Sequence, residues 1–407
     1  MLKGCTGMIK LVEKEHCSGC TACMACCPKE AISMCADEEG FKYPVIDRNQ
    51  CVECEKCVRT CPVTNKQKKN PVVASYIAIN NDKKQRESSA SGGLFSVIAH
   101  YVLEKKGIVF GAAYDEKLRV KHIAIEHEAD LGKLRMSKYV QSDLGDTFKQ
   151  VDKYLKVNRI VLFSGTPCQV AGLRAYINRE DANLILLDLV CHGVPSPKLF
   201  EDYKAALSEK YESDIQNIYF RSKILGHHLS TIAVRFSNGK LIHSRRLVKS
   251  YPRLWFAGFA SRPSCYACSF KEEDRVSDFT LFDSFKSAGQ YGFKDDDMGL
   301  SNVYVRTQKA IDLWKQIETQ VTAVKTETAV TNKNDGDMIY ESAVKNKARA
   351  EFWSDYGKLS YTELIDKYIP YSKKEAIMDK VKRVMVSTGL SKNLKIMRIY
   401  LCAFYNC

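Results

Sequence analysis

Apolar residues along the middle of the chain follow two different periods, which predict a succession of strands and helices. Short runs rich in β-branched and aromatic residues are typical of strands. The expected strands are Val72–Asn80, Ile108–Tyr114, Val120–Glu126, Arg159–Phe163, Leu184–Val190, Ile218–Arg221, Thr231–Ser237 and Phe279–Asp283. Apolar residues three and four positions apart predict helices over Gly92–Lys106, Asp143–Leu155 and Cys168–Asn178.

The stretch from Arg159 to Val190 is the most informative about fold class. Two continuously apolar strands flank one helix there, which is the pattern of a buried parallel pair joined by a crossover. After Ala310 the pattern is mostly helical. We therefore expect an α/β domain with a mixed, partly parallel sheet, followed by a helical C-terminal tail.

Eight cysteines near the N-terminus form two copies of the spacing C-x2-C-x2-C-x3-C-P. They are Cys17, Cys20, Cys23 and Cys27, followed by Pro28, and Cys51, Cys54, Cys57 and Cys61, followed by Pro62. Ferredoxins with two [4Fe–4S] clusters use this run, and the fourth cysteine of each copy binds the other cluster. The spacing predicts one cluster on Cys17, Cys20, Cys23 and Cys61, and another on Cys51, Cys54, Cys57 and Cys27.

Zinc and disulfides are the alternatives for so many thiols. Zinc sites usually combine two separated C-x2-C pairs instead of three cysteines in series. Disulfides need an oxidising compartment, and Met1–Lys14 lacks the apolar core of an export signal. No run reaches the roughly 18 apolar residues of a membrane span. We therefore expect a cytoplasmic protein whose clusters carry electrons.

The cysteine run also suggests how the chain is divided. An α+β ferredoxin-type domain with two clusters is expected over residues 1–66, ahead of a charged linker, Lys66-Gln-Lys-Lys-Asn-Pro71. The α/β domain is expected over residues 72–307, and a helical region with a basic tail over residues 308–407.

Net charge is +14 at pH 7, and the C-terminus holds a share of the excess. From Lys373 to Cys407 there are eight Lys/Arg and two Asp/Glu, with apolar residues at helical spacing. Such a tail could make peripheral contact with an anionic membrane or an acidic partner. The alternative is a helix packed on the domain with its lysines in water. No nucleic-acid partner is expected, because no helix-turn-helix, finger or RNA-binding signature accompanies the charge.

Four further cysteines lie where a metal centre could be held. Cys168 follows Ser164-Gly-Thr-Pro167 at the start of a helix, and Cys191 follows the next strand, so both lie at the carboxyl ends of neighbouring strands. Cys265 and Cys268 form a C-x2-C pair. Together they could hold a third [4Fe–4S] cluster. The alternative is two inert thiols and a pair that binds zinc or nothing.

Six short motifs follow one another in order, and three of them contain these four cysteines. They are Ser91-Gly-Gly93, Ser137-Lys-Tyr-Val-Gln-Ser142, Ser164-Gly-Thr-Pro-Cys-Gln169, Asp188-Leu-Val-Cys-His-Gly193, Cys265-Tyr-Ala-Cys268 and Arg275-Val-Ser-Asp278. In these motifs the sequence resembles the coenzyme F-420 hydrogenase/dehydrogenase beta-subunit family, in the form with an N-terminal two-cluster ferredoxin domain. The resemblance implies FAD, an iron–sulfur cluster on Cys168, Cys191, Cys265 and Cys268, and electron transfer between an organic substrate and ferredoxin-like carriers.

The resemblance also implies a flavin site. The residues expected there are Ser91, Gly92, Gly93, Lys138, Tyr139, Ser164, Gly165 and Thr166, with His192 as a proton donor. A Ser-Gly-Gly turn before a helix could hold a phosphate on backbone amides, and glycine lets backbone approach a cofactor closely. The alternatives are an ordinary helix start, a surface lysine and a structural histidine.

The leading hypothesis is an oxidoreductase that depends on FAD and iron–sulfur clusters, acts on a small-molecule substrate and exchanges electrons with a low-potential carrier. The first alternative is an electron-transfer beta subunit docked to a partner oxidoreductase subunit, without its own substrate. The second is a non-enzymatic iron–sulfur redox sensor. Phe282-Asp-Ser-Phe285 stands where many relatives have Gly-Asp-Phe-Trp, and we expect its first aromatic ring to narrow the substrate side of the flavin pocket.

Overall fold

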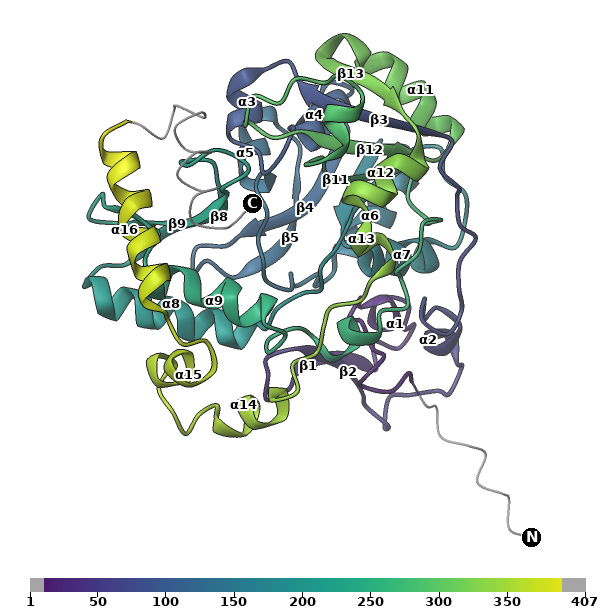
Figure 1. Ribbon diagram of the computed structural model, residues 1–407. Coiled ribbons are helices and arrows are strands. Elements are labelled where there is room, and N and C mark those ends of the chain that lie inside the picture. The colour runs from purple at the N-terminus through teal and green to yellow at the C-terminus, as the bar shows by residue number, and fades with distance from the viewer. Residues whose placement is uncertain (1–10, 390–407) are drawn as a thin grey trace.

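An eight-stranded mixed sheet forms the centre of the protein in the computed structural model, which describes residues 11–389 (Figure 1). Its strands are β3 (Ala74–Asn80), β4 (Ile108–Tyr114), β5 (Val120–Ile125), β6 (Val161–Gly165), β7 (Leu184–Leu189), β11 (Phe279–Asp283), β12 (Ser301–Val305) and β13 (Val321–Thr326). The order is β13-β3-β12-β11-β7-β6-β4-β5. The four strands from β11 to β4 are parallel and the other neighbours antiparallel, which confirms the expected mixed, partly parallel sheet.

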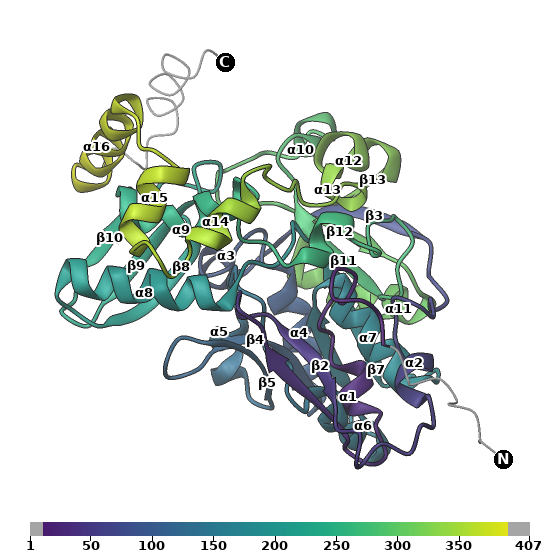
Figure 2. The same cartoon turned by 90° about the horizontal axis from the view of Figure 1, so that it is seen from below.

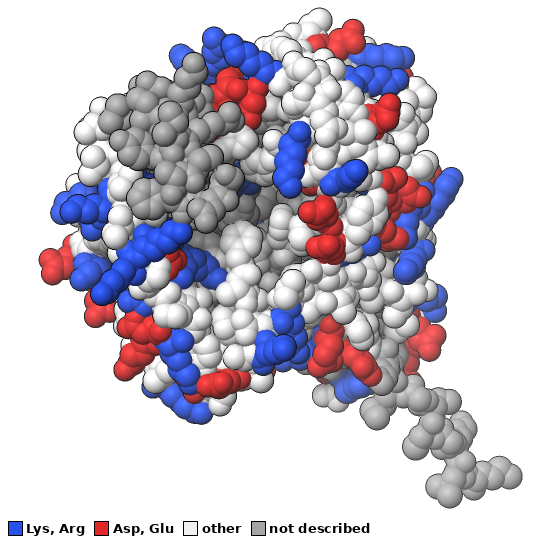
Figure 3. Space-filling model, viewed as in Figure 1, with Lys and Arg blue, Asp and Glu red and all other residues white. Residues whose placement is uncertain are grey.

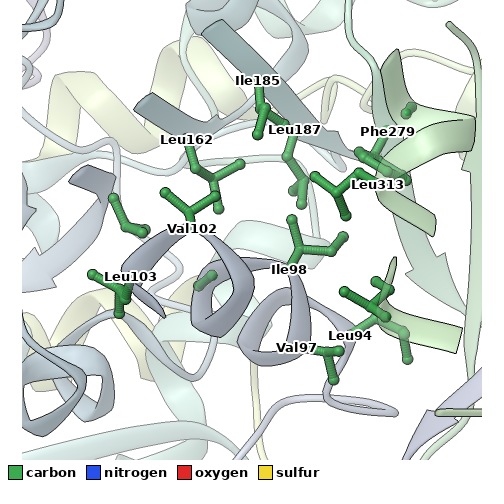
Figure 4. Close-up of a cluster of buried hydrophobic side chains, with 14 of the residues drawn as sticks. Leu94, Val97, Ile98, Val102, Leu103, Leu162, Ile185, Leu187, Phe279 and Leu313 are labelled. Carbon is green, nitrogen blue, oxygen red and sulfur yellow. The ribbon is translucent and has the colours of Figure 1, made fainter. Parts of the chain in front are cut away.

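Helices cover both faces of this sheet. They are α3 (Lys83–Glu87), α4 (Leu94–Glu104), α5 (Leu131–Leu134), α6 (Thr147–Lys156), α7 (Pro167–Ile177) and α11 (Gln308–Ile317). On one face, α4 and α11 bury Ile98 and Leu313 with Leu187 of the sheet (Figure 4). On the other, α6 and α7 share a core with β6, where Phe148 meets Phe163 edge to face. The carboxyl ends of the parallel strands stay outside these cores, as in other open α/β sheets.

A second layered unit stands beside the main sheet. Its antiparallel strands are β8 (Ile215–Ser222), β9 (Thr231–Phe236) and β10 (Leu241–His243), in the order β10-β9-β8. The helices α8 (Pro197–Tyr211), α9 (Arg246–Phe256), α14 (Arg349–Asp355) and α15 (Tyr361–Tyr368) share its apolar core. The sequence analysis anticipated β8 and β9 but not α8, although Ser196 followed by Pro197 is an ordinary helix start.

The N-terminal cysteine-rich part consists of a hairpin and two one-turn helices. The elements are β1 (Ile32–Ala36), β2 (Lys42–Ile46), α1 (Ala22–Ala25) and α2 (Lys56–Arg59). Both cysteine loops have the same backbone course, because Gly19 and Thr21 have positive φ and so do the equivalent Glu53 and Glu55. This part packs against α6 and α7 (Figure 2).

Residues after Ala310 are mostly helical, as expected, and also include one strand that the sequence analysis did not anticipate. β13 pairs antiparallel with β3 from Val321 opposite Asn80 to Thr326 opposite Ser75. The partner lies far away in sequence, so local periodicity could not reveal the pairing. The helices in the remaining part are α10 (Ser287–Gln290), α12 (Thr328–Asp335), α13 (Asp337–Tyr340) and α16 (Lys373–Ser387).

The basic tail begins with α16, which packs on the second unit. Met378 and Met385 are buried, and the buried Asp379 accepts a hydrogen bond from Lys249 Nζ at 2.8 Å. This agrees with the packed-helix alternative for residues 373–387, whereas residues 390–407 lie outside the described residues. Membrane contact through the tail stays a prediction. No helix among residues 11–389 is long and apolar enough to span a bilayer, and basic and acidic side chains are interspersed on the face in Figure 3.

Replacing Asp379 by alanine should lower the free energy of unfolding by about 2 kcal/mol, because it leaves a partly buried lysine without its carboxylate. Asp379 is 1% exposed and lies 2.7 Å from Lys249 at the closest. Urea unfolding of the full chain measures the change. The matched control is Ser387→Ala at the exposed end of the same helix. Equal stability of the two variants would contradict an anchoring role for Asp379.

Candidate iron–sulfur and flavin site

One cavity lies at the outer side of the N-terminal part, and four cysteines line it. They are Cys27, Cys51, Cys54 and Cys57, as the crossed spacing predicted. Cys27 comes from the first cysteine run and the other three from the second. Cys54 is exposed, so solvent reaches this group of thiols.

The other four cysteines of the two runs, Cys17, Cys20, Cys23 and Cys61, form a group that lies deeper in the protein. Burial, together with the neighbouring Cys17 and Cys61 sulfurs, raises the pKa of the Cys20 thiol to about 12. The pKa of Cys23 is raised by burial and by the same neighbours. Cys61 therefore lies with the first run, although it belongs to the second. Gly172 of α7 allows this packing, since a Cβ there would come within 2.9 Å of the Cys20 sulfur.

The other four expected cysteines line a second pocket at the ends of β6 and β7, which we call the third cavity because it holds the third group of thiols. They are Cys168, Cys191, Cys265 and Cys268. Cys168 stands at the start of α7, whose N-cap is Thr166 with Pro167 next, as the sequence indicated. Burial raises the pKa of all four thiols, that of Cys265 to about 12.

Cationic side chains share the walls of this third cavity. Lys271, Arg275 and Arg262 line it, and Lys271 Nζ donates to the Cys191 carbonyl oxygen. Four thiolates around a cluster carry net negative charge, so these cations suit such a group. Within residues 11–389 no group of His, Cys, Asp or Glu is placed to hold a single metal ion. A cubane binds each thiolate at a separate iron corner, which suits thiols arranged around a cavity.

The expected Ser-Gly-Gly turn is held tightly against the main sheet. The Gly92 amide donates to Ser301 Oγ at 3.0 Å, and a Cβ on Gly92 would lie 2.6 Å from the Ala78 carbonyl oxygen. Gly93, with φ of 86°, is the N-cap of α4. Ser91 Oγ donates to the Leu300 carbonyl oxygen, which lies directly before β12. Packing therefore accounts for the glycine at position 92.

Arg135 and Lys223 contact the chain at and just before this turn, and Lys138 holds the backbone of Arg135. Arg135 Nη1 donates to Ser88 Oγ at 3.1 Å, Lys138 Nζ to the Arg135 carbonyl oxygen at 2.6 Å, and Lys223 Nζ to the Ser91 carbonyl oxygen at 2.9 Å. The buried Nε of Arg135 has no hydrogen-bond partner among the described residues. A serine-rich turn with converging cations and an orphaned guanidinium nitrogen fits a phosphate group.

Lys138 and Tyr139 occupy different environments. Lys138 Nζ also donates to the Lys133 carbonyl oxygen at 2.8 Å, and burial lowers the pKa of Lys138 to about 7. Its ammonium group therefore braces the loop before it. Tyr139 packs between Phe220 and Trp255, with ring centroids 5.3 and 4.8 Å away. The surface-lysine alternative for Lys138 is wrong.

Ser164, Gly165 and Thr166 lie at the end of β6, beside the third group of thiols. The Ser164 carbonyl oxygen is 3.0 Å from His122 Nε2, and Gly165 is buried. The hydroxyl of Thr166 lies 3.2 Å from the Cys168 sulfur. This segment therefore faces the thiol cavity, whereas the turn at Ser91 lies elsewhere along the strand ends.

His192 lies between the third cavity and a second polar cluster. Desolvation and the positive charge of Lys271 lower its pKa, and the Asp283 carboxylate acts in the opposite sense. Its ring meets Phe256 edge to face at 6.4 Å. The imidazole is thus mostly neutral at pH 7.

The second polar cluster contains two residues that the sequence analysis did not anticipate. Arg221 Nη1 donates to Asp283 Oδ2 at 2.8 Å, and His227 Nε2 lies 3.0 Å from Arg221 Nη2. Although burial alone would raise the pKa of Asp283, the charge of Arg221 holds it well below its usual range. Arg221 and His227 come from strand and loop positions with no recognisable motif, so the sequence offered no signal for them.

The aromatic pair around Asp283 packs against two other rings. The Phe282 ring lies edge-on against Tyr304 of β12, at 5.0 Å, and Phe285 stacks on His227 at the same distance. Phe282 therefore packs against the neighbouring strand, and its expected effect on the flavin pocket stays a prediction.

Protein-family comparisons match both cysteine-rich regions. Residues 16–65 match a 4Fe-4S dicluster domain. Residues 158–345, which include the third group of cysteines, match the C terminus of the coenzyme F420 hydrogenase/dehydrogenase beta subunit. This part of the chain belongs to the F-420 hydrogenase/dehydrogenase beta-subunit family. The N-terminal part is an iron–sulfur domain of the dicluster type.

Individual proteins show further similarity. One subunit of the F(420)H(2) dehydrogenase of Methanosarcina mazei is 22% identical over 318 residues, which cover 74% of this chain and 81% of the relative. A ferredoxin of Methanocaldococcus jannaschii is 38% identical over 52 residues, 13% of this chain and 66% of the ferredoxin. Among solved structures, the F420-reducing [NiFe] hydrogenase complex from Methanosarcina barkeri aligns with a TM-score of 0.46 at 17% identity, covering 66% of this chain and 89% of that one.

Buried polar contacts join the dicluster domain to the beta-subunit domain. Arg262, 1% exposed, donates to the carbonyl oxygens of Cys17 (2.7 Å) and Lys42 (3.0 Å) and to Gln141 Oε1 (2.9 Å). Its guanidinium lies 4.1 Å from the centre of the Tyr43 ring. Because Arg262 also lines the third cavity, one side chain touches both thiol-rich regions.

Proposed function

We propose that this protein is an oxidoreductase that passes electrons between ferredoxin-type [4Fe–4S] clusters and FAD, and through FAD to or from an organic substrate. The observation that carries the proposal is the gathering of the expected cysteines into three groups of four, two of which line cavities of their own. Membership of the beta-subunit domain in an oxidoreductase family supports it.

The proposed ligands follow these groups. An inner N-terminal cluster would be held by Cys17, Cys20, Cys23 and Cys61, an outer one by Cys27, Cys51, Cys54 and Cys57, and a third by Cys168, Cys191, Cys265 and Cys268. When bound, the clusters would supply single-electron exchange and FAD two-electron exchange. Lys271 and Arg275 would balance negative charge in the third cavity, and the exposed Cys54 marks the side that a low-potential carrier could approach.

The flavin assignment rests on the polar surroundings of the strand ends. Arg135, Lys138 and the turn from Ser88 to Gly93 would hold the phosphates of FAD. Tyr139 would be held in place by its aromatic neighbours Phe220 and Trp255. His192 would exchange a proton at a ring nitrogen, since its lowered pKa leaves it neutral and able to accept one.

Arg135→Gln should weaken FAD binding about tenfold or more, because it removes a cation from the phosphate site, worth at least about 1.4 kcal/mol, and Lys138→Met should weaken it by releasing the loop that carries Arg135. Flavin and iron per chain, measured after anaerobic purification, give the result, and iron should stay unchanged. Lys133→Met is the matched control, since its exposed side chain pairs only with Asp130. Gly92→Val is unsuitable, because it would collide with backbone and test folding instead. Full flavin occupancy in both variants would remove the assignment.

A second candidate function is an electron-transfer subunit that docks to a partner oxidoreductase subunit and has no substrate of its own. It is favoured by the relative named as one subunit of an F(420)H(2) dehydrogenase. Reduced coenzyme F-420 can serve as the probe for both candidates. Reduction of the clusters in the isolated protein would support the leading candidate, and reduction only after a partner subunit is added would support the second.

A further inference from the structure

A series of close polar contacts leads from a buried histidine to one thiol of the third cavity. His122 Nδ1 lies 3.0 Å from Ser142 Oγ, and Gln169 Nε2 lies 2.9 Å from the same hydroxyl. Gln169 Oε1 lies 3.1 Å from Thr166 Oγ, which is 3.2 Å from the Cys168 sulfur. Four of these residues belong to two motifs that the sequence analysis singled out, and His122 completes the chain.

The direction of these hydrogen bonds is fixed at the histidine end. His122 Nε2 is 3.0 Å from the Ser164 carbonyl oxygen, which can only accept, so Nε2 carries the proton. Burial lowers the pKa of His122 to about 4, and Nδ1 is therefore an acceptor at pH 7. It follows that Ser142 donates to His122 and accepts from the amide nitrogen of Gln169. The oxygen of that amide must then point towards Thr166.

The oriented Gln169 amide presents its oxygen to the Thr166 backbone and hydroxyl. Its Oε1 also accepts from the Thr166 backbone amide at 3.0 Å. Gly165 makes room for it, because a Cβ there would lie 3.0 Å from Oε1. With its oxygen fixed beside this amide, the Thr166 hydroxyl has two acceptors within reach, Oε1 and the Cys168 sulfur. A thiolate carries more negative charge than an amide oxygen, so the hydroxyl proton turns to the sulfur once Cys168 is a ligand.

We propose that Thr166 is a positioning residue whose hydroxyl donates a hydrogen bond to the Cys168 sulfur and raises the reduction potential of the third cluster, while Gln169 Oε1, oriented by Ser142 and His122, is the competing acceptor for the same proton. Hydrogen bonds to cluster sulfurs stabilise the reduced, more negative state and so raise the potential. The inference rests on the third cluster of the proposed function. It leaves the two N-terminal clusters untouched, because the hydrogen-bond chain ends at Cys168.

The test is a redox titration of the full-length protein followed by electron paramagnetic resonance, with iron counted in every sample. Thr166→Val keeps the side-chain volume and removes the hydroxyl, so the midpoint potential of the third cluster should become more negative at unchanged iron content. The two N-terminal clusters should keep their potentials. Thr166→Ser retains a hydroxyl and should restore the potential. Ser142→Ala releases the Gln169 amide and weakens the competing acceptor, so it should leave the potential unchanged or shift it slightly in the opposite direction.

Three outcomes overturn the inference. If the Thr166→Val protein keeps all its iron and the potential of the third cluster does not move, this inference is refuted and the proposed function is not affected. Should Thr166→Val lose iron, Thr166→Ala replaces it, because it also removes the hydroxyl, and an unmoved potential in that variant refutes the inference equally. A parent protein whose iron content is unaffected by Cys168→Ser has no third cluster, which overturns this inference together with the proposed function.

Discussion

Cys268→Ser should remove about four of about twelve irons per chain and disconnect the flavin from the N-terminal clusters. Cys268 contributes one of the four thiols around the third cavity, and the serine hydroxyl is a far weaker ligand for iron than a thiolate. The eight cysteines of the dicluster domain form separate groups, so their irons should remain. Reduction of the N-terminal clusters should persist while transfer to FAD falls close to the background rate.

Iron and acid-labile sulfide analysis of anaerobically purified protein measures the first effect, and rapid-mixing spectroscopy the second. Cys35→Ser is the matched control, because Cys35 is exposed on β1 and belongs to none of the three groups. It should keep about twelve irons. A Cys268→Ser protein with the same iron content as this control would show that the four thiols are structural.

Arg262→Met should destabilise the contact between the two domains by about 3–5 kcal/mol and slow electron transfer between them. The substitution keeps much of the side-chain length but removes three donors. The carbonyl oxygens of Cys17 and Lys42 and the amide oxygen of Gln141 would then lose their partner in a buried place. A small shift of the loop at Cys17 would also displace a proposed ligand of the inner cluster.

Urea unfolding and rapid-mixing kinetics of the full chain measure the two effects of Arg262→Met. Lys42→Met is the matched control at the same contact, since its pair with Asp143 is nearly half exposed and should contribute about 0.5 kcal/mol or less. If both variants unfold alike and transfer electrons at the same rate, Arg262 does not hold the domains together.

The sequence specified the parts of this site that depend on spacing along the chain. The pattern C-x2-C-x2-C-x3-C-P predicted which loop supplies the fourth cysteine, and the cavity lined by Cys27 together with the second run agrees with it. The ends of β6 and β7 were also predictable. Short, continuously apolar strands are typical of a parallel sheet, and the carboxyl ends of neighbouring parallel strands lie together. Thr166 followed by Pro167 likewise fixed the start of α7.

Only the tertiary structure decided which distant residues complete the site. Arg262 contacts Cys17, and His122 contacts Ser164 and Ser142. The strand β13 pairs with β3, although the two lie near opposite ends of the domain in sequence. None of these partners is marked by local periodicity, because each contact satisfies a polar group that becomes buried only when separate elements pack. Local spacing fixes which side chains share a loop or a strand end, whereas the need to pair every buried donor and acceptor selects their partners from anywhere in the chain.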